Sequence, residues 1–438
     1  MDYIDFIHTY RFLIAFLAGI GTFLTVLKFY KKVLMAAGLF LKRKFRPTEK
    51  KHKYAICIAA RNERAVIKNL LDSIDNQDYP MDKLSVFVVA DNCTDDTAEI
   101  VENYKGEHLK NVFVYRHENP EERTKGFALR YLFDRIIEDR GIETYDAFFV
   151  FDADNVLCPD YITRMNEAFD EGYKIVTSFR NSKNASRNWI SFSYAMHWWR
   201  TCLGEHRANS FFHIACRIQG TGFMFSNELV RNGWKYTSLT EDRAFCTDAV
   251  VMNYDITYCE AAMFYDEQPY KLKVALRQRL RWAKGHLLST VENEPKLIKN
   301  LFVSDNNLIS TYNCFWLNFP GNIETGARRL LTIIFNILIG VYYGELYGYL
   351  IGFVVSTLTA LLKYWLENMG SCVFVLIWYR KRIDKIKPLP LLFYVFMFPF
   401  FDKIGKWSMY VALFRHVEWK PIPHDTVTDI STLKSGER

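Results

Sequence analysis

The stretch FFVFDADN, residues 148–155, carries two carboxylates, Asp152 and Asp154, directly after a run of aromatic and aliphatic residues. Residues i and i+2 of a strand point to the same face, so both carboxylates lie side by side if the strand continues through them. Each then raises the pKa of the other unless a positive charge lies nearby. A divalent cation would remove that repulsion, and oxygen ligands of this kind suit Mg²⁺ or Mn²⁺. A lone D-x-D is also typical of a strand that simply ends in a solvated loop, so the pattern needs support from elsewhere in the chain.

Polar residues also end two strands predicted upstream. Arg61-Asn62-Glu63 follows YAICIAA, and Asp91-Asn92 ends KLSVFVVADN. Predicted helices over VIKNLLDSI, DDTAEIVENY and GFALRYLFDRII alternate with these strands and with NVFVY. The alternation predicts an α/β domain with a parallel sheet over residues 53–300, whose ligands gather at the carboxyl ends of the strands. The three sets of polar side chains therefore predict a single nucleotide-sized site.

The first strand-to-helix turn has no glycine-rich phosphate loop. No glycine occurs between Gly38 and Gly106, which excludes both a G-x-G-x-x-G turn and a P-loop there. The charge of a bound diphosphate must then be neutralised in another way. A cation held by Asp152 and Asp154 would do so.

Two further motifs lie downstream. Thr240-Glu241-Asp242 occurs in TSLTEDRAF, and Gln278 and Arg281 occur three residues apart, hence on one helix face, in VALRQRLRWAKG. Alone, T-E-D is typical of a helix cap, and the second motif is equally typical of a basic amphipathic helix at a membrane surface.

Apolar segments frame this polar middle and predict a membrane protein. Residues 12–27, FLIAFLAGIGTFLTVL, carry no charge and are flanked by Tyr10 and Tyr30. Seven of the twelve residues 42–53 are Lys or Arg, so the positive-inside rule predicts a cytoplasmic α/β domain and an outside N-terminus. The acidic start MDYIDFIHTY argues against a signal peptide.

A second apolar zone, residues 330–416, predicts three or four spans, with breaks at Glu345, at 380–387 and at Pro399. The predicted organisation is a membrane helix and basic linker over 1–52, the cytosolic domain over 53–300, interfacial and membrane helices over 301–416, and a cytosolic tail over 417–438.

The amino-acid composition and the net charge of the chain indicate which kinds of partner it binds. The chain has 438 residues, 50% of them hydrophobic and 24% charged, and its formal net charge of +7 is modest. We therefore expect a lipid bilayer and no nucleic acid as a partner. Nine scattered cysteines without a C-x-x-C pair predict reduced thiols in a cytosolic domain.

The motifs occur in a characteristic order: a strand-end Asp, D-x-D, T-E-D, Q-x-x-R-W and then apolar helices. This order resembles that of the membrane-embedded processive family 2 glycosyltransferases. These are the cellulose, chitin, hyaluronan and mixed-linkage glucan synthases. The resemblance covers nearly the whole chain. It implies a Rossmann-like glycosyltransferase A domain fused to transmembrane helices in the plasma membrane. It also implies transfer of sugar from a UDP-sugar donor to a growing polysaccharide acceptor, which passes out through a channel of the same chain.

The resemblance also implies a role for each motif residue. Glu63 and Asp91 would contact the uridine, Lys125 would border the nucleotide, Asp152 would hold the donor and Asp154 the metal. Asp242, with Glu241 and Thr240, matches the catalytic T-E-D, and Gly220-Thr221-Gly222 matches the acceptor-binding turn. Gln278, Arg279 and Arg281 would bind the donor diphosphate, and Trp282 the acceptor. The gating loop of cellulose synthases has no clear copy here, and HDTVTDI, residues 424–430, is a weak substitute.

The chemistry implied is a single in-line displacement with inversion. A metal-bound nucleoside diphosphate leaves without a protein acid, so the protein needs one base on the acceptor side, and a hydrolase would need a flanking carboxyl pair instead. Similarity to short Gram-positive glucan synthases favours UDP-glucose and a β-glucan, with mixed 1,3 and 1,4 linkages as one form of product. Chitin-like or hyaluronan-like synthesis from UDP-N-acetylglucosamine, and a non-processive enzyme with a lipid acceptor, stay open. Aromatic platforms for the polymer are expected among Trp198, Trp199, Trp282 and Trp316, although interfacial anchoring explains most of them equally well.

Overall fold

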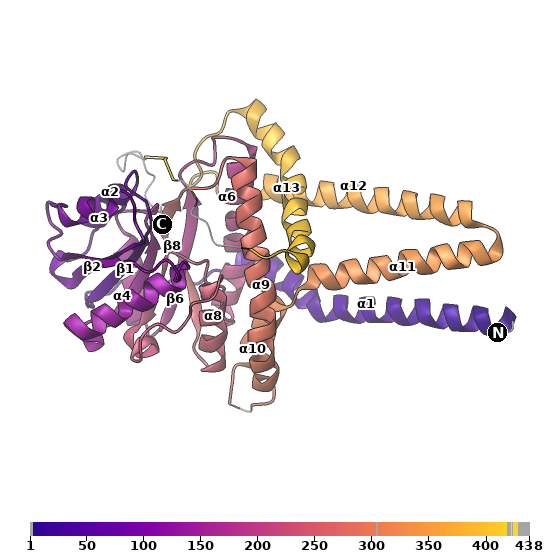
Figure 1. Ribbon diagram of the computed structural model, residues 1–438, viewed down its shortest axis with the longest axis horizontal. Helices are drawn as coiled ribbons and strands as arrows, with labels where there is room; N and C mark the ends of the chain where they lie inside the picture. Colours follow the sequence, from indigo (N-terminus) through magenta and orange to yellow (C-terminus); the bar gives the residue numbers. More distant parts are fainter. Residues whose placement is uncertain (1–2, 304, 418–421, 423, 428–438) are drawn as a thin grey trace.

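The structure is a computed structural model that describes residues 3–303, 305–417, 422 and 424–427. It consists of an α/β body and a group of long helices, three of which project away from that body (Figure 1). The functional site depends on how these two parts meet.

One half of the central sheet is parallel, as predicted. Its strand order is β3-β2-β1-β4, and all three pairings are parallel. Helices connect successive strands, which is the connection that parallel strands require. The strands are β1 Tyr54–Ala60, β2 Leu84–Asp91, β3 Val112–His117 and β4 Ala147–Asp152, and the helices between them are α2 Ile67–Asp75, α3 Thr97–Glu102 and α4 Lys125–Arg140.

The other half of the sheet is mixed and was not predicted in detail. The order continues β7-β6-β8-β5, with β7 antiparallel to both β4 and β6. Strand β8 runs parallel to β6 and carries a bulge opposite Ser178 and Phe179. The bounds are β5 Val156–Leu157, β6 Ile175–Ser182, β7 Phe223–Ser226 and β8 Ile256–Asp266.

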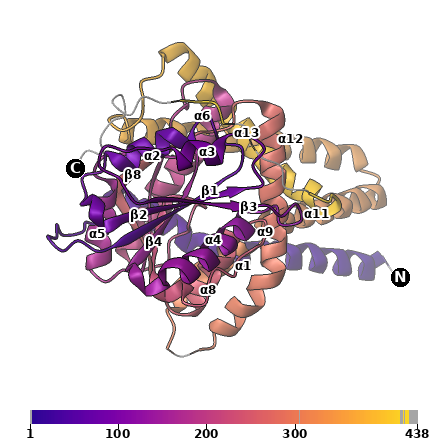
Figure 2. The ribbon, with the colours of Figure 1, turned by 60° about the vertical axis from the view of Figure 1, so that its left-hand side comes forward.

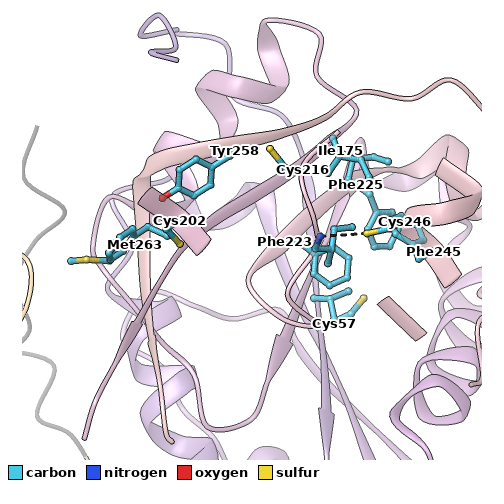
Figure 3. Close-up of a cluster of buried hydrophobic side chains, with 14 of the residues drawn as sticks. Cys57, Ile175, Cys202, Cys216, Phe223, Phe225, Phe245, Cys246, Tyr258 and Met263 are labelled. Atoms are coloured by element: carbon cyan, nitrogen blue, oxygen red, sulfur yellow. Dashed lines mark hydrogen bonds between the residues drawn. The ribbon is translucent and has the colours of Figure 1, made fainter. Parts of the chain in front are cut away.

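Helices cover both faces of the sheet (Figure 2). Buried residues of α2 and of α5, Tyr161–Asp170, pack on one face. On the other face lie α4, α6 (Trp189–Thr201) and α8 (Glu241–Val251), and α7 (Arg207–Phe211) follows α6. Figure 3 shows part of this second layer, in which Cys57, Cys202, Cys216 and Cys246 lie among aromatic rings. Eight of the nine cysteines are buried, and Cys93 is half-buried.

The remaining helices are long and largely apolar. They are α1 Tyr3–Phe40, α9 Leu272–Asn300, α10 Leu308–Asn318, α11 Gly321–Tyr343, α12 Leu346–Trp378 and α13 Pro388–Phe414. Within the described ranges, four helical segments are long and apolar enough to span a membrane: Arg11–Phe40 and helices α11, α12 and α13. The predicted breaks at Glu345 and at 380–387 separate α11, α12 and α13. The break predicted at Pro399 is wrong, because α13 continues through that residue.

The long helices differ in direction. Helices α1, α11 and α12 project together away from the α/β body, whereas α13 and α9 run crosswise at their base (Figure 1). Helix α13 packs on α6, α9 and α12. It therefore lies between the α/β body and the projecting helices, where an interfacial helix would lie.

Candidate active site

A cavity of about 480 Å³ lies between the carboxyl ends of the strands and the crosswise helices. Its wall includes residues from every motif identified in the sequence. Arg61, Glu63, Asp91, Asp152 and Asp154 line one end, and the other end is lined by residues of α9 and α13. The polar residues at the three strand ends thus line one cavity.

Asp152 and Asp154 lie in different surroundings. The Asp152 carboxylate pairs with the Lys125 ammonium. The backbone N–H of Asp152 donates to Thr221 Oγ1 at 2.9 Å. Asp154 is buried, and its Oδ2 accepts the N–H of Glu267 at 2.6 Å. Burial raises the pKa of the Asp154 carboxyl, but the charge of His424 and of other nearby cations outweighs burial and holds the pKa below its ordinary value. The Asp154 carboxylate is therefore suited to the ionised state.

The turn Gly220-Thr221-Gly222 is tied to the end of β4. The Gly222 N–H donates to Val150 O at 2.9 Å, and Lys125 Nζ donates to Gly220 O at 2.8 Å. Gly222 has φ +65°, and a Cβ there would overlap the ring of Phe264. Glycine is thus required at this position by both conformation and space.

The T-E-D motif forms the start of α8. Glu241 and Asp242 occupy its first turn, where the helix dipole favours negative charge. A Cβ on Gly220 would lie 3.7 Å from Asp242 Oδ2, so the Asp242 carboxylate lies beside the predicted acceptor turn. Burial, followed by repulsion from Asp242, raises the pKa of Glu241 to about 7. Near neutral pH, Glu241 is therefore partly protonated.

Helix α9 covers this region and carries the Q-x-x-R-W residues. A Cβ on Gly285 would lie 2.5 Å from Thr240 Cγ2, so this glycine lets α9 approach α8 closely. Arg281 Nη1 donates to Leu239 O at 3.1 Å, and Gln278 and Arg281 both line the cavity. Arg279 was predicted to bind the donor diphosphate. Its guanidinium lies 3.8 Å from the ring centroid of Phe401, on the α13 wall of the cavity.

The predicted tryptophan platforms separate into two groups. Trp282 and Trp198 line the cavity, with their ring centroids 5.9 Å apart. Trp199 was considered as a platform, but it is fully buried and donates to Asn181 Oδ1 at 3.1 Å. Trp316 is also buried and packs beneath Lys28 at 4.7 Å. Trp198 and Trp199 are neighbours on α6, so they point to different sides of the helix.

A segment of the tail reaches back over the strand ends. His424 Nδ1 lies 2.9 Å from Glu63 Oε1, and the Asp425 and Thr426 N–H groups donate to the Glu267 carboxylate at 3.3 and 2.9 Å. We call residues 424–427 the tail strap. Burial lowers the pKa of His424, but Asp154 and Glu63 raise it more, to about 10. The rest of HDTVTDI, residues 428–430, lies outside the described residues.

Sequence reasoning missed several cavity residues. Arg180 Nε donates to Asp266 Oδ2 at 2.6 Å, and burial raises the pKa of Asp266 to about 6. A signal for Asp266 and Glu267 was present, because Asp266 ends a strand, as Asp91 and Asp152 do, and Glu267 follows it. Strand β8 reaches this edge by pairing parallel with β6, which is joined to β4 through the antiparallel strand β7, and this order left no pattern in the sequence.

The carboxylates fit a divalent cation only together with a ligand. Among the described residues, no group of three or more His, Cys, Asp or Glu side chains is arranged to hold a metal ion. Asp152 and Asp154 nevertheless present carboxylate oxygens to one cavity, and Mg²⁺ is commonly bound by one or two carboxylates plus substrate phosphates. The donor set is thus compatible with Mg²⁺ or Mn²⁺ shared with a diphosphate.

Comparison with known proteins identifies the family to which this protein belongs. The family described as glycosyltransferase-like family 2 matches residues 52–285, more than half of the chain. The protein belongs to this family and has a glycosyltransferase A-like α/β fold followed by apolar helices.

Particular relatives are more distant. A probable glycosyltransferase of Bacillus subtilis is 27% identical over 300 residues, covering 65% of this chain and 67% of its own length. A poly-β-1,6-N-acetyl-D-glucosamine synthase of Staphylococcus epidermidis is 25% identical over 52% of this chain and 53% of its own length. A hyaluronan synthase of Streptococcus pyogenes is 22% identical over 60% of this chain and 64% of its own. The chain thus spans about half to two thirds of these relatives.

Among solved structures, a mannosyltransferase from Pyrobaculum calidifontis in complex with GDP-mannose and Mn²⁺ has a TM-score of 0.47 and 18% identity. It covers 78% of this chain and 99% of its own. TarS of S. aureus, residues 1–349, in complex with UDP has a TM-score of 0.39 and 15% identity, covering 60% of this chain and 69% of its own.

Proposed function

We propose that the protein transfers a hexosyl group, with inversion, from a UDP-sugar to the hydroxyl of a polysaccharide that grows at the membrane surface. The observation that carries this proposal is the single cavity that joins the D-x-D end, Asp242 and Trp282. The D-x-D carboxylates lie at the donor side, and the Asp242 carboxylate and the Trp282 ring lie at the acceptor side. This arrangement suits glycosyl transfer, whereas hydrolysis needs a pair of carboxyl groups that flank the bond.

The donor occupies the strand ends. Glu63 and Asp91 contact the uridine, and Lys125 borders the nucleotide. Asp152 and Asp154 hold the divalent cation, Mg²⁺ or Mn²⁺, which neutralises the diphosphate and makes it a good leaving group. Arg281 adds planar guanidinium donors for the departing phosphates, since it faces the same cavity.

The acceptor hydroxyl lies between the Gly220–Gly222 turn and Asp242. Asp242 takes the hydroxyl proton as the acceptor oxygen forms its bond to the sugar anomeric carbon and the bond from that carbon to the diphosphate oxygen breaks. An α-linked donor then yields a β-linked product. The position of Asp242 beside the acceptor turn, with its Oδ2 3.7 Å from where a Cβ on Gly220 would lie, supports Asp242 as the base.

UDP-glucose and a β-glucan, including a mixed 1,3;1,4-linked one, are the donor and product we test first. The membrane is the plasma membrane, the α/β body is cytoplasmic, and export through a channel of the same chain is part of this proposal. Relatives named poly-β-1,6-N-acetyl-D-glucosamine synthase and hyaluronan synthase support polymer synthesis and keep UDP-N-acetylglucosamine as an alternative donor.

The test is a panel of radiolabelled UDP-sugars given to the purified full-length protein with Mg²⁺ or Mn²⁺. Incorporation of glucose into long polymer, with β linkages found by methylation analysis, is the expected result. If polymer forms from another UDP-sugar, only the proposed identity of the donor sugar changes. Absence of transfer from every donor, in protein that still binds UDP, would overturn the proposed activity.

A further inference from the structure

The end of the cavity farthest from the D-x-D motif is unusually rich in arginine. Arg217, Arg243 and Arg279 line the cavity in addition to Arg281 of the Q-x-x-R-W motif. The resemblance implied a donor-diphosphate role for Arg279, but we assign the first three to another ligand, because Arg279 faces α13 and the other two lie beside α6 and α10. Arg217 Nη2 donates to Thr201 Oγ1 at 3.2 Å, and Arg243 Nη1 donates to Leu317 O at 3.1 Å.

These guanidiniums form no short ion pair within the described residues, although Asp242, Asp402 and Glu205 are near enough to act on them. Across the described part of the chain, no ion pair within 4.0 Å involves Arg217, Arg243 or Arg279, whereas the cations of the donor end do form such pairs. The carboxylate on the α13 wall, Asp402, lies 2.8 Å from Lys406 and is thus already paired. Glu205 is near enough to Arg217 to feel its charge, but it does not line the cavity. The wall at this end therefore carries net positive charge.

Polar atoms in the same wall lack hydrogen-bond partners. Within the described residues, the buried atoms without a partner include Arg217 Nε, Arg279 Nε, Trp198 Nε1, Thr240 Oγ1, Gln219 Oε1 and Gln278 Oε1, all from residues that line the cavity. Buried polar groups rarely stay unsatisfied, so these atoms indicate a polar ligand. The pKa of His197 is lowered to about 3, first by burial and then by the positive charges of Arg217 and Arg279. The low pKa is consistent with a positively charged wall.

The position of this end favours a membrane lipid as the ligand. Its wall includes Gly405 and Met409 of the crosswise helix α13, and Asn322 at the start of α11. Among the described residues, no other residue of α11 and none of α1 or α12 lines the cavity. The cavity therefore reaches the base of the projecting helices where α11 begins (Figure 1). If α11 spans a membrane, its first residues lie at the level of the lipid headgroups.

We propose that Arg217 and Arg279, assisted by Arg243, bind the phosphate of a membrane lipid on which the acceptor glycan is carried. Guanidinium groups bind phosphate through paired N–H donors, and a wall with net positive charge favours an anionic over a neutral acceptor. This inference rests on the proposed function for the identity of the acceptor, but the anion site itself does not depend on the sugar transferred. A neutral glucan chain alone would leave these three charges unused.

The experiment measures binding of dodecyl phosphate to the full-length protein in dodecyl maltoside, with UDP and Mg²⁺ at saturation so that the donor site is filled. Arg217→Gln and Arg279→Gln should each weaken dodecyl phosphate binding about tenfold or more, the usual effect of losing a charge-assisted hydrogen bond. Arg279→Lys should recover part of that loss. UDP affinity should stay within about twofold in all three variants, since a factor of two is below 0.5 kcal/mol.

The matched control is Arg116→Gln, which removes an exposed arginine that pairs with Glu99 and Glu102 of α3 and does not line the cavity. It should bind dodecyl phosphate normally. Thermal unfolding of each variant shows whether the fold is intact.

Dodecyl phosphate binding that is absent, or unaffected by either substitution in folded protein, would overturn the inference. Equal affinity for inorganic phosphate and dodecyl phosphate would overturn the lipid assignment, as would arginine-dependent binding of a soluble tetraglucuronate in place of dodecyl phosphate. Failure of all donors in the UDP-sugar panel, with dodecyl phosphate binding retained, would instead reject the proposed function and leave the anion site standing.

Discussion

At the scale of single residues, Asp152 and Asp154 differ more than their shared motif suggests. Asp152 is paired with Lys125, whereas Asp154 is buried and held by the Glu267 N–H. A cation at this position would thus depend most on Asp154, which has no side-chain cation bonded to it in the described structure.

Asp154→Asn should abolish transfer and remove metal-dependent UDP binding, because a neutral amide binds Mg²⁺ much more weakly than a carboxylate. Titration of UDP binding against Mg²⁺ measures the effect. The control is Asp139→Asn, an exposed carboxylate that accepts the Tyr115 hydroxyl at 2.8 Å, far from the cavity. Near-normal synthesis by Asp154→Asn at limiting Mg²⁺ would show that the metal is held elsewhere.

Asp242→Asn should leave UDP binding nearly unchanged and reduce transfer by about 10² or more, the usual scale for loss of a general base. Glu241→Gln is the matched neighbour. It removes a group that is already partly protonated at pH 7, so it should cost less activity. Loss of UDP affinity in parallel with loss of rate in Asp242→Asn would assign this carboxylate to substrate binding instead.

At the scale of elements, the acceptor turn and the tail strap are the two segments that complete the site. The turn leads into β7 and is hydrogen-bonded to the neighbouring strand β4. The tail strap contacts Glu63, just beyond the end of β1. Each depends on one residue whose type is difficult to replace.

Gly222→Ala should lower the free energy of unfolding by roughly 1–3 kcal/mol from backbone strain, with a further loss from overlap with Phe264. Gly172→Ala is the control that separates these causes. Gly172 also has a positive φ, of +101°, but nothing lies within 4 Å of its Cβ position. Equal shifts of the thermal unfolding midpoint in the two variants would show that the contact with Phe264 contributes little.

The pairing of His424 with Glu63 should stabilise the folded chain in a pH-dependent way. The pKa of His424 is raised to about 10 in the folded state, so this contribution is complete below pH 6.5 and disappears as pH rises through about 10. Each unit of pKa shift corresponds to about 1.4 kcal/mol. His424→Ala should therefore lower the unfolding midpoint strongly at pH 6 and weakly at pH 10.

The comparison is His108→Ala, which removes an exposed histidine. Its midpoint difference from the parent should be small at every pH. A His424→Ala difference that does not change between pH 6 and pH 10 would mean that the ion pair does not form.

At the scale of the whole molecule, the cavity lies where the α/β body meets the long apolar helices. Helices α11 and α12 have 23 and 33 residues, and about 20 residues suffice to cross a bilayer. The turn between them at Gly344 and Glu345 should then lie on the side of the membrane opposite the α/β body.

Cysteine labelling tests this topology. Glu345→Cys should react with a membrane-impermeant maleimide in intact cells, whereas Lys381→Cys should react only after permeabilisation. Both positions are exposed, and most native cysteines are buried, so background labelling should be low. Labelling of Lys381→Cys in intact cells would place the α/β body outside.

The sequence by itself determined the parallel half of the sheet, because period-2 and period-3.6 apolar patterns are local. It also indicated the apolar helices and the family, since D-x-D, T-E-D and Q-x-x-R-W are contiguous motifs in a characteristic order. Asp266 was missed because β8 joins this edge of the sheet only through the order β4-β7-β6-β8, which is not local in the sequence. His424 was named only within a weak substitute for a gating loop, because its place beside Glu63 comes from a tail hundreds of residues away. The direction of α13 and the unpaired Arg217 and Arg279 likewise depend on packing between distant segments. A single helix carries no information about what covers it, so only the tertiary structure decided where the positive charge of the cavity lies.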